Sequence, residues 1–238
     1  MSPFIKAQNF EVLEQYWIKV ESNLSNIPAE RKENLQSLAN YVSKSLKQDG
    51  TADVMFICTH NSRRSHFGQI WMSSAAHHLD IDGVNTYSAG TEATAFNARA
   101  IAALERAGLF AEHISDSVML QRLDTSKVRL KYVDAFNRNN KVMMITVGKM
   151  ARPVFCFSKT IEHALNPKAD FGAVMTCSSA DAACPNVRGA NFRVAIPYSD
   201  PKISDTKPEE MATYDARCLQ IATEMLWVMQ SVRQTLRK

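Results

Sequence analysis

Apolar residues recur at helical spacing through the first fifty positions of the chain. One run consists of Phe10, Leu13, Trp17, Val20 and Leu24, and a second of Leu35, Leu38, Tyr41, Val42 and Leu46. Intervals of three and four residues place such side chains on one face of a helix. Pro28 separates the runs, and Gly50 follows the second one where a helix is expected to end. The pattern predicts a helical extension over residues 1–50, interpreted as a cap on the main domain, or alternatively as a hairpin that binds a partner or a second copy.

After Gly50 the pattern changes to short apolar runs that alternate with helical spacing. Strands are predicted over residues 54–57, 86–90, 142–147, 154–157 and 173–176. Helices are predicted over residues 65–79, 97–108 and 209–232. This alternation is typical of a parallel sheet with helices on both faces. We therefore expect one α/β domain over residues 51–238, built on a central parallel sheet of about four strands.

A polar stretch of poor periodicity over residues 121–141 interrupts this alternation. Such a stretch lacks the apolar face that would hold it against a core. We interpret it as a surface excursion within an insertion, with a lid over a binding site as the alternative.

The composition is that of an ordinary globular protein, because 45% of the 238 residues are hydrophobic and 22% are charged. The formal net charge of +4 is not concentrated in any run, so nucleic-acid binding is not indicated, whereas a small anionic substrate suits the charge. The amino terminus lacks the apolar core of a signal peptide, and no stretch approaches the roughly 20 apolar residues of a membrane span. We therefore expect a cytoplasmic protein without membrane association.

Five cysteines make thiol chemistry possible. They are Cys58, Cys156, Cys177, Cys184 and Cys218. An odd number fits a structural disulfide framework poorly, and cytoplasmic thiols are mostly reduced, so any disulfide is expected to be catalytic or transient. Their spacing is not that of a zinc site. The sequence therefore indicates no metal site and no cofactor.

Residues 58–65 combine a nucleophile with groups that bind an oxyanion. Cys58 directly follows a predicted strand, and a helix is expected to begin near Ser65. Ligands of open α/β sheets bind at the carboxyl ends of the strands, where the next helix offers free N–H groups and a positive dipole. This field also favours the thiolate form of a cysteine. We expect Arg64 to clamp two oxygens of the anion with its forked guanidinium group.

The remaining loop residues supply backbone N–H groups or side chains to the same anion. They are Thr59, His60, Asn61, Ser62, Arg63 and Ser65. The hydroxyl of Ser65 could also donate a hydrogen bond to the Cys58 thiolate. The alternative is a buried cysteine at a strand end with an arginine nearby by chance.

This loop resembles the phosphate-binding loop of the low-molecular-weight protein tyrosine phosphatase superfamily, which includes the thioredoxin-coupled arsenate reductases. Residues 87–91, with the sequence Tyr-Ser-Ala-Gly-Thr, resemble the superfamily's second-strand motif, and the helix predicted over residues 97–108 resembles the one that follows it. The resemblance covers about residues 52–235 and implies a phosphatase-like α/β fold. The amino-terminal helices and a segment around residues 110–165 fall outside the family pattern, and we interpret that segment as an insertion.

Two positions of the loop depart from the usual family sequence Cys-Thr-Gly-Asn-Ser-Cys-Arg-Ser. His60 stands in place of glycine, and Arg63 in place of cysteine. If His60 must adopt a positive φ, the loop carries strain. The extra charge of Arg63 favours an anionic substrate.

The resemblance also implies a general acid. An Asp-Pro pair before the last helix supplies it in the family, and Asp200 and Pro201 occupy that place here. Proline restricts the residue before it to an extended backbone, which can hold the Asp200 carboxylate toward the cysteine loop. Alone, the pair could be an ordinary turn, and Asp205 is the substitute candidate.

Cys177 and Cys184 distinguish the two branches of the superfamily. A phosphatase needs one nucleophilic cysteine, whereas a reductase needs further thiols to carry two oxidising equivalents. The segment from Cys177 to Cys184 and Pro185 is similar to the reductase pattern. That resemblance implies a Cys58–Cys177 disulfide, then a Cys177–Cys184 disulfide that thioredoxin reduces. Two ordinary cysteines, one buried and one on a surface turn, are the alternative.

Three functional hypotheses follow from these residues. The first is an arsenate reductase, an activity associated with arsenic resistance, that uses Cys58, Arg64, Asp200, Cys177 and Cys184. The second is a low-molecular-weight phosphatase that hydrolyses phosphate monoesters through a Cys58 phosphocysteine. The third is an oxyanion sensor or scaffold that binds partners through its amino-terminal helices.

Overall fold

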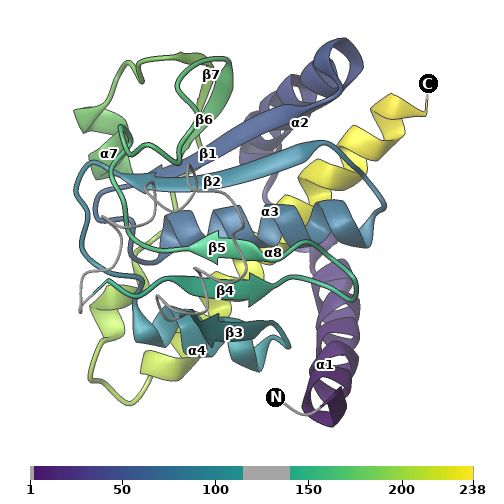
Figure 1. The fold of residues 1–238 in the computed structure, drawn as a ribbon, viewed down its shortest axis with the longest axis vertical. Coiled ribbons are helices and arrows are strands. Elements are labelled where there is room, and N and C mark those ends of the chain that lie inside the picture. The colour runs from purple at the N-terminus through teal and green to yellow at the C-terminus, as the bar shows by residue number, and fades with distance from the viewer. Residues whose placement is uncertain (1–2, 115–139, 238) are drawn as a thin grey trace.

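A central sheet of four parallel strands organises the chain (Figure 1). The computed structural model describes residues 3–114 and 140–237. The strands are β1 (Ala52–Cys58), β2 (Val84–Gly90), β6 (Phe171–Met175) and β7 (Ala190–Ala195), in the order β2-β1-β6-β7. All neighbouring pairs are parallel, which confirms the predicted sheet. The carboxyl ends of β1 and β6 therefore lie side by side, with Ile57 opposite Met175.

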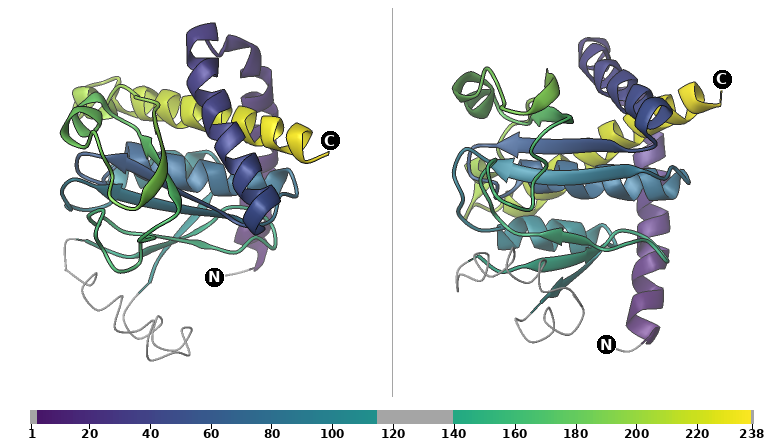
Figure 2. Two further views of the ribbon diagram at one scale, coloured as in Figure 1. Left: turned by 90° about the horizontal axis from the view of Figure 1, so that it is seen from above. Right: turned by 45° about the horizontal axis from the view of Figure 1, so that its top comes forward.

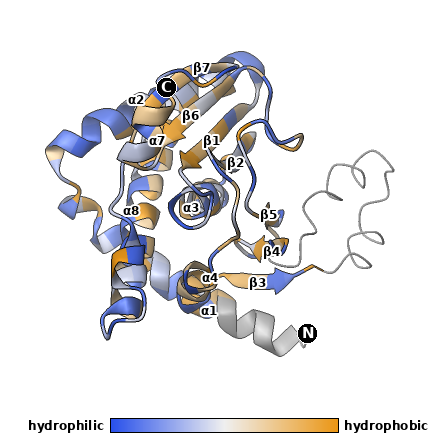
Figure 3. Cartoon of the chain, turned by 90° about the vertical axis from the view of Figure 1, so that its left-hand side faces the viewer, coloured by the Kyte–Doolittle hydropathy of each residue, from blue (hydrophilic) through white to orange (hydrophobic). Residues whose placement is uncertain are grey.

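Side chains of β1 alternate between two apolar cores. Val54 and Phe56 belong to a large cluster with the long helices, whereas Met55 and Ile57 belong to a smaller cluster that includes Ala180 of α7 (Ser178–Ala183). Figure 3 shows the apolar character of β1 and β6. Successive residues of a strand point to opposite faces. Helices on both faces thus bury a central strand of nearly continuous apolar residues.

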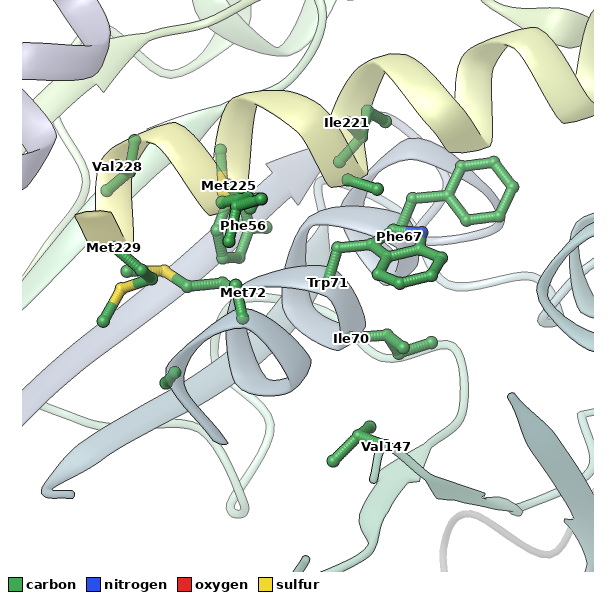
Figure 4. Packing of buried hydrophobic residues seen from close by; sticks show 14 of the residues in the cluster. Phe56, Phe67, Ile70, Trp71, Met72, Val147, Ile221, Met225, Val228 and Met229 are labelled. Atoms are coloured by element: carbon green, nitrogen blue, oxygen red, sulfur yellow. The ribbon is translucent and has the colours of Figure 1, made fainter. Parts of the chain in front are cut away.

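The helix α3 (Arg64–His78) packs on the first face of the sheet, and α8 (Glu210–Leu236) packs against α3. Figure 4 shows Phe56 among side chains of both helices, including Met225. Gly68 allows α3 to approach the strand, since a Cβ there would lie 2.3 Å from Cδ1 of Phe56. This close packing fixes the start of α3 against the end of β1.

The predicted amino-terminal helices are present as α1 (Pro3–Ser22) and α2 (Ala29–Asp49), joined by the short helix η1 (Leu24–Asn26). Figure 2 shows them beside α8. Trp17 is buried, and its ring meets the ring of Trp71 edge-on at 5.5 Å. Gly50 ends α2 with a φ of 71°, as its position predicted. The helices therefore share the large core with the sheet.

A second, antiparallel sheet corrects one expectation. Residues 142–147 and 154–157 do form strands, β4 (Met143–Thr146) and β5 (Val154–Cys156), but these pair with β3 (Phe110–His113) rather than with the parallel sheet. Only residues 147–153 separate β4 from β5, and a parallel pair would need a crossover connection of about a dozen residues or more. The strands β3 and β7 were not predicted.

The helix α4 (Ala98–Arg106) begins at Asn97, whose side chain accepts a hydrogen bond from the N–H of Arg99, as the sequence predicted. Most of the polar stretch at 121–141, and with it the alternative of a lid, lies outside the described residues. Within residues 3–114 and 140–237, no helix is long and apolar enough to cross a membrane.

Candidate active site

The proposed nucleophile lies at the carboxyl end of β1, where the chain enters a loop that leads to α3. Cys58 is 3% exposed, and its Sγ lies 3.1 Å from Oγ of Ser65. Asn61 Nδ2 donates to the same Ser65 oxygen at 2.9 Å. With Asn61 as its donor, the Ser65 hydroxyl can direct its own hydrogen at a Cys58 thiolate.

The strained position of the loop is Asn61 and not His60. Asn61 has a φ of 43°, whereas His60 is absent from the residues with positive φ. Asparagine tolerates this conformation better than most residues because its short polar side chain bonds locally. Here Asn61 Oδ1 also accepts the backbone N–H of Lys159 at 2.8 Å. The histidine that replaces the family's glycine therefore imposes no left-handed backbone.

Flanking segments bind the carbonyl groups of the loop. The His60 carbonyl accepts from Oγ1 of Thr94 at 3.1 Å and from Oγ of Ser158 at 2.9 Å. The Thr59 carbonyl accepts from the N–H of Glu92 at 2.8 Å. Among the described residues, the N–H groups of residues 59–63 have no hydrogen-bond acceptor. Free N–H groups of successive residues form a concavity that suits an anion.

Gly90 at the end of β2 permits this close approach of strand and loop. A Cβ on Gly90 would lie 2.3 Å from the carbonyl oxygen of Glu92 and 2.7 Å from the backbone nitrogen of Asn61. Any larger residue would push the loop away from β2.

Arg64 reaches the segment that carries the proposed acid. Its Nη2 lies 2.7 Å from Oδ2 of Asp200, and its Nη1 donates to the carbonyl of Tyr198 at 3.1 Å. Its Nε is buried without a hydrogen-bond partner in the described part of the chain. Arg64 thus retains a donor for a further oxygen atom.

The backbone of Asp200 is extended, with φ −74° and ψ 121°, as expected for a residue before proline. Its Oδ1 accepts the N–H of Lys202 at 3.1 Å, which caps the short helix η2 (Pro201–Ser204). Arg64 and the cap together hold the carboxylate beside the cysteine loop.

Cys177 lies beside this loop because β6 neighbours β1. It is 2% exposed and packs in the same apolar cluster as Cys58. Its Sγ lies 3.5 Å from Oγ1 of Thr59 and accepts the N–H of Ala180 at 3.4 Å. Cys177 is therefore a buried cap of α7 that contacts the nucleophile's own loop.

Cys184 caps the other end of α7 and is half-buried. Arg193 of β7 donates to the Cys184 carbonyl at 3.1 Å and pairs with Asp181 at 2.5 Å. All five cysteines are free thiols. The fold thus places two thiols at opposite ends of one short helix, one of them next to the loop.

Arg63 is directed toward the start of α8. Its Nε donates to the Tyr214 hydroxyl at 2.7 Å, and its Nη2 lies 3.3 Å from Oδ2 of Asp205. Burial, followed by the hydrogen bond to Asp205, raises the pKa of Tyr214 to about 12. The charge of Arg63 is thus compensated by Asp205, and a role for Arg63 in substrate binding stays a prediction.

The remaining cysteines belong to the core, as the sequence indicated. Burial raises the pKa of Cys156 and of Cys218 to about 12. Trp71 Nε1 donates to Sγ of Cys218 at 3.2 Å. Among the described residues, no group of three or more His, Cys, Asp or Glu is placed to hold a metal ion.

A partly buried ion pair links the amino-terminal helices to the acid segment, and no pattern in the sequence indicated it. Arg31 of α2 forms a two-pronged pair with Glu224 of α8 at 2.6 and 2.7 Å. Arg31 also donates to the Pro197 carbonyl at 3.1 Å, and the Tyr198 hydroxyl donates to Glu224 at 2.7 Å. Tyr198 in turn accepts from Arg64, so α2 contributes to the position of the site.

Comparison of the sequence with known protein families gives one match. Residues 53–172 match the family described as low molecular weight phosphotyrosine protein phosphatase. The chain belongs to this family.

Similar solved structures show low identity to this chain. A low molecular weight phosphotyrosine phosphatase from Vibrio cholerae O395 is 13% identical, with 77% of this chain and 97% of that chain covered and a TM-score of 0.40. A low molecular weight protein tyrosine phosphatase from T. tengcongensis is 14% identical, with 77% and 99% covered and a TM-score of 0.41. A thioredoxin-dependent arsenate reductase from Corynebacterium glutamicum is 17% identical, with 85% and 71% covered and a TM-score of 0.35. No curated protein matches the chain.

Proposed function

We propose that this family member reduces arsenate to arsenite through Cys58, Cys177 and Cys184. The observation that carries the proposal is the position of Cys177, buried in one cluster with Cys58 and 3.5 Å from Thr59 of the nucleophile's loop. Hydrolysis of a phosphate ester needs no second thiol there. A two-electron reduction does need one, because the oxidising equivalents must leave as a disulfide.

In the first step, arsenate binds to the N–H groups of residues 59–63 and to the guanidinium of Arg64. The Cys58 thiolate attacks arsenic, an As–S bond forms and an As–O bond breaks. Asp200, held 2.7 Å from Arg64, supplies the proton with which the oxygen leaves as water. The Ser65 hydroxyl stabilises the thiolate before the attack.

In the second step, the Cys177 thiolate attacks the sulfur of Cys58. A Cys58–Cys177 disulfide forms, and the As–S electron pair passes to arsenic, which leaves as arsenite in the +3 state. In the third step, the Cys184 thiolate attacks the sulfur of Cys177 and releases the Cys58 thiolate. An external dithiol such as thioredoxin then reduces the Cys177–Cys184 disulfide and is itself oxidised to a disulfide. This chemistry requires a reducing compartment, which fits a cytoplasmic location.

The third step requires α7 to unwind. The two cysteines cap opposite ends of this six-residue helix. A helix rises about 1.5 Å per residue, so its ends lie farther apart than the reach of a disulfide. Unwinding also requires Arg193 to release the Cys184 carbonyl and Asp181.

Phosphate-ester hydrolysis is the second candidate. The loop, Arg64 and Asp200 supply what this reaction needs, with Cys58 as the nucleophile that forms a phosphocysteine. If the protein is a phosphatase, Cys177 and Cys184 protect Cys58 from oxidation or have no role. The contact of Arg64 with Asp200 supports this candidate as well as the first.

Parallel assays of reduction and hydrolysis separate the candidates. Arsenate-dependent NADPH consumption, coupled through thioredoxin and its reductase, is measured beside hydrolysis of p-nitrophenyl phosphate. We expect Cys58→Ser to abolish both activities, and Cys184→Ser to abolish multiple turnovers of reduction while hydrolysis persists. Cys156→Ala, a buried thiol away from the loop and α7, is the matched control and should change neither activity.

Three outcomes contradict the proposed relay, in which oxidising equivalents pass from Cys58 to Cys177 and Cys184. If reduction survives in Cys184→Ser unchanged, the third step is excluded. If the protein hydrolyses phosphate esters but reduces no arsenate, phosphatase activity is the function that remains. Absence of both activities, with arsenate or phosphate still bound, favours the sensor hypothesis.

A further inference from the structure

Lys159 is a buried cation outside the proposed catalytic residues. Its side chain belongs to a residue that is 4% exposed, and within the described chain its Nζ has no hydrogen bond and no carboxylate partner. Nζ of Lys159 lies 4.9 Å from the centroid of the Phe157 ring. Lysine is rarely buried without a partner.

Burial of this ammonium group destabilises its charged form. Desolvation lowers the pKa of Lys159 to about 8, and the nearby thiol of Cys156 offsets only part of that effect. Burial lowers the pKa of His66, and the charge of Lys159 lowers it further. An ammonium group in this environment would gain from an anion placed next to it.

A cavity of about 280 Å³ lies at Lys159, between β2, α3 and the strand β5. Its walls include the aromatic rings of Tyr87 and Phe157 and the apolar side chain of Leu165, and Ser73 adds a hydroxyl group. Arg152 lines the cavity too and is exposed. None of the described lining residues is an Asp or a Glu. The volume is near the lower end of the range for small-molecule sites, about 300–1,000 Å³.

We propose that this cavity is a second ligand site that takes a small carboxylate with an aromatic or apolar body. Lys159 is the buried cation of the cavity and balances one negative charge, whereas the charge of Arg152 is exposed to solvent, so a carboxylate fits better than a dianionic phosphate. The rings of Tyr87 and Phe157 pack against the body of the ligand, and Nζ of Lys159 pairs with its carboxylate. The site shares no lining residue with the cysteine loop.

The backbone of Lys159 couples this cavity to the oxyanion loop. Its N–H donates to Asn61 Oδ1 at 2.8 Å, and its carbonyl accepts from the N–H of Gly90 at 2.9 Å. Asn61 is the loop residue with positive φ and the partner of Ser65. A ligand that pairs with the Lys159 side chain therefore shifts the backbone that bonds Asn61, the residue that fixes the shape of the loop.

Titration with benzoate, followed by amide NMR in the full chain, tests the site directly. The titration is performed on Cys58→Ser saturated with inorganic phosphate, so that the cysteine loop is occupied and catalysis plays no part. We expect saturable shifts at residues 84–87 and 152–159 and at the amides of Asn61 and Gly90. Benzyl alcohol, which lacks the charge, should bind at least tenfold more weakly.

Two variants distinguish binding in this cavity from nonspecific binding of benzoate elsewhere on the protein. Lys159→Met should weaken benzoate binding at least tenfold, and Ser73→Phe, which fills the cavity while Lys159 remains, should do the same. Lys149→Met, an exposed lysine, is the matched control and should bind like the parent. The proposal is overturned if benzoate shifts only the amides of residues 58–65, if benzyl alcohol binds equally well, or if both cavity variants bind benzoate as the parent does. Because the readout is binding, failure of arsenate reduction leaves this test intact.

Discussion

Arg64 Nη2 and Asp200 Oδ2 lie 2.7 Å apart, so the proposed clamp and the proposed acid are direct partners. We expect a bound oxyanion to compete with Asp200 for the guanidinium group. Under the proposed function, binding of the substrate would then release the carboxylate to face the departing oxygen.

Replacement of the acid should separate these two roles. We expect Asp200→Asn to lower kcat about 10²–10³-fold, because the leaving oxygen loses its proton donor. Phosphate should bind this variant as tightly as the parent or more tightly, since Arg64 no longer pairs with a carboxylate. Inhibition of p-nitrophenyl phosphate hydrolysis by phosphate measures both quantities. Asp215→Asn, which removes a carboxylate of α8 that also pairs with an arginine, Arg106, is the matched control. Weaker phosphate binding by Asp200→Asn would contradict the competition.

The ion pair of Arg31 with Glu224 should support both stability and activity. Arg31→Met leaves the Glu224 carboxylate buried without its cation, which we expect to destabilise the protein by about 3–5 kcal/mol. The double variant Arg31→Met, Glu224→Gln should recover much of this loss in urea unfolding. Both variants should reduce kcat more than phosphate affinity, because the Tyr198 segment loses its support from α2.

Asn34→Ala is the control on the same helix, since Asn34 donates to the Ala195 carbonyl at 3.0 Å and has no contact with Glu224. An equal loss of activity in this variant would show that any damage to α2 suffices.

The buried Lys159 should make stability depend on pH. Its pKa is about 8 in the folded chain against 10.5 for an ordinary lysine, so the unfolded chain binds more protons between these values. The contribution of Lys159 to the free energy of unfolding should therefore rise as pH increases from about 8 to 10.5. The buried thiols of Cys156 and Cys218, whose pKa values are raised, contribute in the opposite direction above pH 9, so the effect of Lys159 is the difference between the parent and Lys159→Met. Lys159→Met should remove this rise and be about 1–3 kcal/mol more stable than the parent at pH 7. Urea unfolding at several pH values measures the effect, and Lys149→Met should retain the parent's dependence.

The pair of Arg193 with Asp181 should slow the last step of the relay. Arg193 holds both the Asp181 side chain and the Cys184 carbonyl, and both contacts must break before α7 unwinds. We expect Arg193→Met to accelerate formation of the Cys177–Cys184 disulfide severalfold, as followed by quench with iodoacetamide and mass spectrometry. The exposed Arg188→Met is the control. An unchanged or slower rate in Arg193→Met would show that the helix does not limit this step.

Local patterns predicted the part of the site that is continuous in sequence. The run before Cys58, the loop and the following helix are fixed by neighbouring residues, and the hydrogen bond of Ser65 to Cys58 followed from them. Resemblance to the family indicated Asp200 and the two distal thiols. These elements needed no knowledge of the rest of the fold.

Contacts between segments far apart in the sequence could not be predicted in the same way. β7 is half-exposed and contains Asn191 and Arg193, so it shows no apolar run. The pairing of β4 with β5 depends on the direction of the chain rather than on composition. Lys159 is 98 residues from its partner Asn61, and Arg31 is 193 residues from Glu224. No local spacing encodes such pairs.

The carbonyl of His60 is held by Thr94 and Ser158, which are 34 and 98 residues farther along the chain. Contacts over such separations require long segments to be closed first, and they form late in folding. A nascent chain that exposes only β1 and α3 therefore carries Cys58 without the contacts that hold the His60 carbonyl. We expect affinity for an oxyanion only after residue 158 has emerged from the ribosome and docked.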